Sequence, residues 1–150
     1  FLNKEFKLKE YDNLIKEVIE SGGEFRMYPK GISMLPILRQ GKDSVVLVKP
    51  TFPLCRGQII FYQRKNGQYV LHRIVGVGKD DYVLCGDNQT YREKGVTQDM
   101  IIAVVNRIYR GDKEVSQKIH KIYEFLWRPF IIRRGIHFLG RIFGGTKTKR

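Results

Sequence analysis

Six short runs rich in Val, Ile and Tyr occupy the middle of the chain, from about residue 24 to residue 108. Gly, Pro or Asp interrupts the chain between them, a pattern typical of β-strands joined by turns. The runs are EFRMYP, SVVLVKP, QIIFYQR, QYVLHRIVGV, DYVLCG and MIIAVVNRIY, and the Asn-Gly pair in RKNGQY predicts a hairpin turn. This pattern predicts a mainly β domain.

Helical patterns flank the β-region on both sides. In residues 8–21 apolar side chains recur every three or four positions until Gly22 and Gly23, which predicts an amphipathic helix. A second helical pattern covers residues 116–127, and Pro129 breaks or kinks it. We therefore expect an N-terminal amphipathic helix in residues 1–23, a β-domain in residues 24–112 and a basic amphipathic helical tail in residues 113–150.

The charge of the chain is unusual, because 28 Lys and Arg against 15 Asp and Glu give a net charge of +13. Residues 117–150 hold nine of these cations and one acid, so +8 of the excess belongs to the tail. Aromatic residues accompany the arginines there, as in helices that lie on an anionic membrane. We expect either peripheral attachment to the inner face of the membrane or a helix packed on the β-domain. Nucleic acid is an unlikely partner, because no recognised reader precedes the β-domain.

The two cysteines, Cys55 and Cys85, suggest neither a disulfide framework nor a metal site, and free thiols suit a reducing compartment. No apolar run reaches the roughly 18 residues that a spanning helix needs. The first residues, FLNKEFKLKE, alternate apolar and charged side chains, unlike a secretory signal. These features predict a cytoplasmic protein that needs no metal and no cofactor.

One serine interrupts an apolar stretch that prolines bracket, PKGISMLPIL. A serine nucleophile needs an exposed Oγ on a stiff turn, a base within hydrogen-bond reach and an N–H aimed at the developing oxyanion. Ser33 suits the first demand, because Gly31 lets a substrate chain approach and Met34 can pack beneath the turn. The alternative is a serine that only satisfies a turn.

His72 lies in the middle of the alternating run YVLHRIVGV. Alternation puts His72 on the face of the strand that holds core residues, and puts Arg73 on the other face. An imidazole in a core needs a polar partner, and that role is more often structural than catalytic. The other histidines, His120 and His137, fall in the tail. If Ser33 has a histidine base, it is therefore His72.

A carboxylate follows the next predicted strand, in CGDNQTYREKGV. Gly86 and the Asp-Asn pair predict a tight turn there, which can project Asp87 into a neighbouring site. Asp87 can then orient His72 and stabilise its protonated form. The alternative is that Asp87 and Asn88 only form the turn.

Together, GISMLPIL, LHRIVGV and CGDNQ resemble the motifs of the signal-peptidase-I-like serine peptidases, a superfamily that also contains the self-cleaving repressors of the DNA-damage response. The resemblance covers about residues 25–109. It implies a coiled, mostly antiparallel β-fold and an endopeptidase that binds a peptide or protein substrate as an added strand. It also implies Ser33 as nucleophile and oxyanion N–H donor, His72 as base, Asp87 as third member, and Gly31, Ser33 and Met34 in the oxyanion and substrate groove.

The usual base of this superfamily is a lysine kept neutral by burial, whereas His72 at this position resembles the archaeal and endoplasmic-reticulum branch. An imidazole, with an ordinary pKa of ~6.5, can accept a proton at neutral pH. Many His-type members carry a further acid about six residues after the GDN aspartate, so Glu93 is the alternative acid. Lys42 separates a Gly-Asp pair that usually adjoins, which predicts a longer turn.

We therefore expect a hydrolase, a signal peptidase-like serine protease that removes a leader or signal-like segment during peptide maturation. Its mechanism would use a Ser-His dyad, with an acid as third member, and the basic tail would make it membrane-associated. Two alternatives remain. One is a non-catalytic module on the same fold that binds a peptide or a membrane. The other is a self-cleaving regulator, which is disfavoured because a single helix precedes PKGISM and no Ala-Gly or Cys-Gly cleavage linker does.

Overall fold

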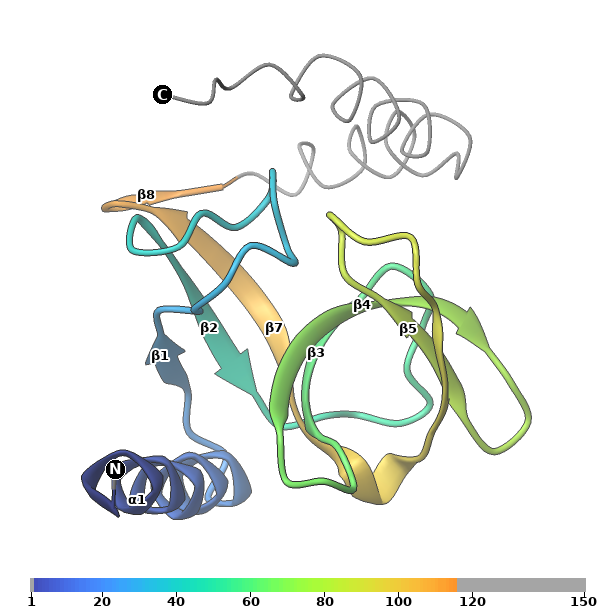
Figure 1. Cartoon of the computed structure of the whole chain (residues 1–150), viewed down its shortest axis with the longest axis horizontal. Coiled ribbons are helices and arrows are strands. Elements are labelled where there is room, and N and C mark those ends of the chain that lie inside the picture. Colours follow the sequence, from blue (N-terminus) through green and yellow to red (C-terminus); the bar gives the residue numbers. More distant parts are fainter. Residues whose placement is uncertain (1, 116–150) are drawn as a thin grey trace, which may run out of the picture. The chain divides into compact units, whose positions relative to one another are not determined.

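The computed structural model describes residues 2–115 of the chain, with side chains from residue 11 onward (Figure 1). The predicted tail therefore lies outside the described residues from position 116, together with His120 and His137. Within the described residues, no helix is long and apolar enough to cross a membrane.

The prediction of a mainly β fold is confirmed, since one helix at the N-terminus precedes a single antiparallel sheet. The elements are α1 (Leu2–Glu20), β1 (Phe25–Met27), β2 (Asp43–Val48), β3 (Ile59–Gln63), β4 (Tyr69–Val77), β5 (Tyr82–Cys85), β6 (Glu93–Val96), the 3-10 helix η1 (Gln98–Met100), β7 (Ile101–Arg110) and β8 (Lys113–Glu114). Each of the six predicted runs contains one observed strand. The two short strands β6 and β8 have no such run, because their sequences are mostly charged.

The sheet runs in the order β1-β2-β7-β3-β4-β5-β6, and β8 pairs with β7. Register shifts interrupt four of the strand pairs, between β2 and β7, β3 and β7, β4 and β5, and β5 and β6. Such shifts bend strands and increase their twist. Figure 1 shows the result, with β3, β4 and β5 curving around one end of the sheet.

The side chains that point into this curved part form the main core. On β3, β4 and β5 they fall at alternate positions, as period-2 patterning requires. The cluster consists of Leu54, Ile60, Tyr62, Val70, Ile74, Tyr82, Leu84, Val96, Ile101 and Val104. His72 lies between two of its members along β4 and pairs in register with a third, Ile60 of β3. It is therefore on the inward face, and it is buried.

Helix α1 lies within the expected N-terminal segment of residues 1–23 and ends just before Gly22 and Gly23, where the sequence predicts. The N–H of Gly22 donates to the carbonyl of Ile19, and the N–H of Gly23 donates to that of Val18. These are the two bonds of a Schellman motif, and Gly22 adopts the positive φ of 82° that the motif requires. Ile15 and Ile19 are buried, whereas Tyr11 and Leu14 of the predicted apolar face are exposed.

The predicted hairpin connects β3 to β4. Arg64 and Gln68 flank its loop: Arg64 N–H donates to Gln68 O over 2.8 Å, and Gly67 N–H donates to Arg64 O over 2.8 Å. Gly67 has a φ of 85°. This is a three-residue loop, a type of hairpin in which glycine takes the left-handed position after a turn. Its length fixes the register that places Ile60 beside His72.

Candidate active site

A cavity of about 220 Å³ opens between two segments that are far apart in the sequence. One segment carries Ser33, and the other carries His72. The remaining lining residues are Pro29, Lys30, Gly31, Met34, Leu38, Arg64, Gln68, Tyr69, Val70, Leu71 and Gln89. The structure thus brings the predicted nucleophile and the predicted base to the same cavity.

Ser33 begins a run of turn residues between β1 and β2. The N–H of Leu38 donates to the carbonyl of Met34 over 2.9 Å, and both side chains are buried together with Ile37. These apolar side chains hold the turn against the domain. Among the described residues, no hydrogen bond engages the Oγ or the N–H of Ser33. The hydroxyl and the predicted oxyanion donor are therefore both available to a substrate.

Gly31 has a φ of 93°, in the left-handed region where glycine is favoured. Its N–H donates to Gln40 Oε1 over 2.8 Å. That bond fixes the chain before Ser33 but also occupies the Gly31 N–H. A Cβ at this position would meet nothing within 4 Å. The positive φ therefore favours glycine at this position, whereas the space around it does not exclude a side chain.

The turn after β5 holds the backbone of Ser33 in place. The N–H of Asn88 donates to the carbonyl of Ser33 over 2.7 Å, and Asn88 Nδ2 donates to that of Ile32 over 3.2 Å. A Cβ on Gly86 would lie 2.7 Å from the same Ser33 oxygen, closer than real contacts allow. The CGDNQ motif thus positions the serine, through a glycine and a backbone N–H.

Asp87, the predicted third member, lies in this turn and is buried. Its carboxylate accepts two hydrogen bonds from Arg73, from Nε and from Nη2, each over 2.8 Å. Arg73 also donates to the carbonyl of Gly57 over 2.7 Å. Since Arg73 follows His72 directly along β4, the two side chains point to opposite faces of the strand. Asp87 thus pairs with the residue on the face that His72 does not occupy.

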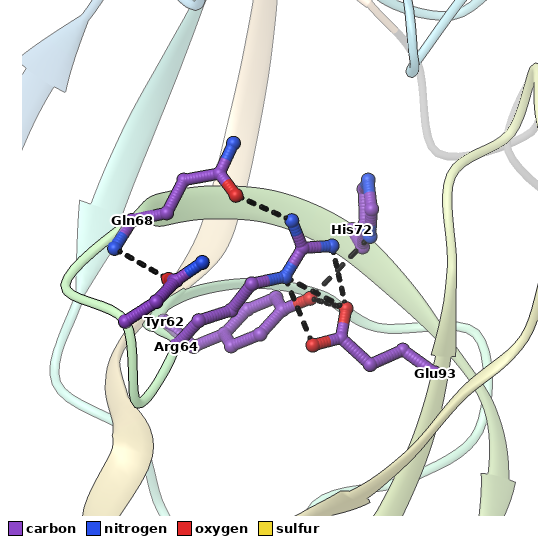
Figure 2. Close-up of polar contacts among 6 residues, drawn as sticks. Tyr62, Arg64, Gln68, His72 and Glu93 are labelled. Carbon is purple, nitrogen blue, oxygen red and sulfur yellow. Dashed lines mark hydrogen bonds and ion pairs between the residues drawn. The ribbon is translucent and has the colours of Figure 1, made fainter.

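His72 has a different polar neighbourhood, which Figure 2 shows. Its Nδ1 lies 3.4 Å from the hydroxyl of Tyr62, a long contact, and the same hydroxyl donates to Glu93 Oε2 over 2.6 Å. Arg64 donates to both oxygens of Glu93, from Nε over 2.9 Å to Oε1 and from Nη2 over 2.7 Å to Oε2. Glu93, the alternative acid, is therefore connected to His72 through Tyr62.

The electrostatics of this group keep His72 neutral. Burial and then the charge of Arg64 lower the pKa of His72 to about 4, while the Glu93 carboxylate acts in the opposite direction. Partial burial opposes ionisation of Glu93, but the hydrogen bonds from Arg64 and Tyr62 outweigh it and lower the pKa of this carboxyl group. Burial, followed by the bond to Glu93, raises the pKa of Tyr62. At neutral pH the site holds a free imidazole, a protonated phenol and a carboxylate.

Two other chemistries, a metal site and a lysine base, find little support in residues 2–115. No group of three or more His, Cys, Asp and Glu side chains is placed to hold a metal ion there. Lys30 is a lysine of the cavity lining, but its side chain is exposed. A lysine base depends on burial to lose its proton, so His72 is the better base.

No protein-family model matches the chain, and no curated protein or solved structure matches it either.

Sequence reasoning missed Tyr62 and Arg64. The Asn-Gly pair predicts the hairpin but not the length of its loop, and the observed three-residue loop, centred on Asn66, places Tyr62 opposite Val70, one inward position from His72. Period-2 alternation then puts the phenol on the same face as the imidazole. The role of Asn88 had no comparable signal, since its partners are backbone carbonyls from a distant turn.

Proposed function

We propose that this chain is a serine endopeptidase that cuts a leader or signal-like segment from a peptide or protein. The observation that supports the proposal is the shared cavity, which Ser33 and His72 both line although about forty residues separate them in the chain. The available Ser33 hydroxyl and the neutral imidazole support it. The coiled antiparallel sheet is compatible with the signal-peptidase type of fold, which we propose for residues 25–109.

In the proposed reaction, Ser33 Oγ attacks the scissile carbonyl carbon and its proton passes to His72. The Ser33 N–H donates to the oxyanion that develops on the carbonyl oxygen. His72 then gives the proton to the leaving amine as the C–N bond breaks, which leaves an acyl group on Ser33. Water, deprotonated by His72, hydrolyses that ester and restores both residues.

The proposed substrate lies extended along the cavity between Ser33 and the first part of β4. Small side chains next to the cut suit a cavity of about 220 Å³. Among the described side chains, in residues 11–115, Lys30 and Arg64 line this cavity and no acidic side chain does. A library of peptides with a small residue at varied positions, read by mass spectrometry, is the matching set of substrates.

The test compares the parent protein with Ser33→Ala and His72→Gln on this library. We expect Ser33→Ala to abolish cleavage and His72→Gln to slow it by roughly 10²- to 10⁴-fold, the usual contribution of a general base. Ser44→Ala is the matched control, because Ser44 is a buried serine whose Oγ accepts from Arg26 outside the cavity. No cleavage by the parent, or equal cleavage by Ser33→Ala, contradicts the proposal and favours the binding module.

We also propose that the basic residues 117–150 attach the enzyme to an anionic membrane surface. Their net charge of +8 and their aromatic residues support this role. Co-sedimentation with anionic vesicles, compared between the parent and the full chain carrying Arg133→Glu and Arg134→Glu, tests it. Equal binding of both proteins contradicts the attachment.

A further inference from the structure

The hydroxyl of Tyr62 is buried next to His72, which lines the cavity, and lies between this imidazole and a carboxylate (Figure 2). A phenol has one proton and can donate only once. The 2.6 Å contact with Glu93 Oε2 decides where that proton lies, because two oxygen atoms at this distance need a proton between them. Since Glu93 is a carboxylate paired with Arg64, the proton belongs to Tyr62, which donates it to Glu93.

The direction of this bond determines what His72 does. The Tyr62 oxygen has no second proton to offer, so at Nδ1 of His72 it can only accept. A neutral imidazole carries one proton, which the Tyr62 contact then holds on Nδ1. The other ring nitrogen, Nε2, is left with a free lone pair. Because His72 lines the cavity that holds Ser33, this is the tautomer that a base for Ser33 requires.

We propose that Tyr62 is the positioning residue of this site: it fixes the tautomer and orientation of His72, and it carries the hydrogen-bonded connection from Glu93 to His72. The inference rests on the proposed function, because the tautomer matters only if His72 is a base. It assigns to a tyrosine the place that a carboxylate occupies beside the histidine of a Ser-His-Asp arrangement.

Arg64 and Gln68 complete the support. Arg64 holds both oxygens of Glu93, and its Nη1 donates to Gln68 Oε1 over 2.7 Å. The loop between β3 and β4 therefore fixes the carboxylate, which belongs to the edge strand β6. During attack His72 becomes an imidazolium, and its Nδ1–H then faces a hydroxyl that is itself bonded to a carboxylate. Negative charge one hydrogen bond away stabilises that state without a carboxylate in direct contact.

The first measurement does not depend on peptidase activity. In the ¹⁵N-labelled full chain, long-range ¹H–¹⁵N spectra at pH 7 report which ring nitrogen of His72 is protonated, with His72→Gln identifying its signals among the three histidines. We expect the proton on Nδ1 in the parent and a mixture of tautomers in Tyr62→Phe. Tyr82→Phe is the matched control, since that buried hydroxyl accepts from the Leu54 N–H instead. The proton on Nε2 in the parent, or an unchanged tautomer in Tyr62→Phe, overturns the inference.

The second measurement is the rate of peptide cleavage by the same variants. Tyr62→Phe should lower kcat by roughly 10- to 100-fold with little change in KM. This loss is larger than that expected from one neutral hydrogen bond and smaller than that expected when the histidine holds only the wrong tautomer. Glu93→Gln keeps an acceptor for Tyr62, so it should preserve the tautomer and cost less. Glu93→Gln should slow Tyr62→Phe by less than it slows the parent, because the hydrogen-bonded connection from Glu93 to His72 is already lost in Tyr62→Phe and only the through-space effect of the charge remains. Additive losses overturn the relay, whereas a parent without peptidase activity contradicts the proposed function and leaves the spectra to decide the tautomer.

Discussion

Two arginine–carboxylate pairs lie near β4, and they do different work. Arg73 and Asp87 are both buried, with 7% and 4% of their side chains exposed, and their bidentate contact fixes the turn that holds the Ser33 carbonyl. Arg64 and Glu93 are more exposed, at 28% and 18%. One carboxylate oxygen of Glu93 also accepts a hydrogen bond from the Tyr62 hydroxyl, which lies beside His72. Similar ion chemistry thus stabilises the backbone in one place and adjusts an imidazole in the other.

The comparison teaches that burial and neighbours, rather than residue type, decide what a carboxylate contributes. A buried pair contributes little net stability compared with an apolar pair, but breaking it leaves an uncompensated charge in the core. A partly exposed pair keeps some hydration, so the fold tolerates its loss. The carboxylate acts instead on the group that it contacts, here Tyr62, and through Tyr62 on His72.

The largest expected effect is therefore on stability at the buried pair. Asp87→Asn keeps the shape of the side chain but leaves the Arg73 charge without its counter-ion, so we expect the free energy of unfolding to fall by about 3–5 kcal/mol. Glu93→Gln should lower it by about 1 kcal/mol or less. Urea unfolding followed by circular dichroism measures both values. Equal losses in the two variants would remove the distinction between the pairs.

The second effect is on the pH dependence of stability, and it belongs to His72. The pKa of an unfolded imidazole is ~6.5, and in the fold Tyr62, Arg64 and Glu93 surround a ring whose pKa is lowered to about 4. Between these values the unfolded chain binds more protons, so the free energy of unfolding should fall by about 3 kcal/mol as the pH drops from ~6.5 to ~4.

Comparing the parent with His72→Gln isolates this contribution, because every other titrating group is common to both proteins. The two unfolding free energies should converge as the pH is lowered through this window. A constant difference across the same range would mean that His72 is not held neutral by the fold.

The smallest expected effect is on the rate of peptide cleavage, and it should differ between variants of Glu93 and of Asp87. With a base whose pKa is about 4, kcat/KM should stay constant from neutral pH down to about 5 and fall only below that. Because Glu93 raises the pKa of His72, Glu93→Gln should move this acid limb to lower pH and reduce the plateau about tenfold, which corresponds to ~1.4 kcal/mol. Asp87→Asn, corrected for its folded fraction, should leave the limb in place. A shift of the acid limb in Asp87→Asn instead would mean that Asp87, and not Glu93, is the acid that acts on His72.

Much of this arrangement could be predicted from the sequence. Alternation in YVLHRIVGV places His72 and Arg73 on opposite faces, and the resemblance of three motifs predicts that Ser33, His72 and the turn around Asp87 lie near one another. The strand runs and the hairpin glycine follow from local chemistry. These features depend on neighbours within a few residues, where pattern and propensity are informative.

The partner of each acid could not be predicted in the same way. Which face of β4 the Asp87 turn meets depends on a register shift between Ile74 and Gly76, which long-range pairing decides. Glu93 lies on β6, whose sequence EKGV lacks any strand pattern, since an edge strand with charged residues needs none.

The most direct test of the account is the chemical identity of the nucleophile. The parent protein is mixed with a cleavable peptide ester, quenched in acid within one turnover and analysed by intact mass and tandem mass spectrometry. We predict an acyl adduct on Ser33, absent from Ser33→Ala and slower to form in His72→Gln and Tyr62→Phe than in Tyr82→Phe. Cleavage of the ester with an adduct on another residue, or equal adduct formation in the His72→Gln variant, would contradict the assignment of Ser33 and His72.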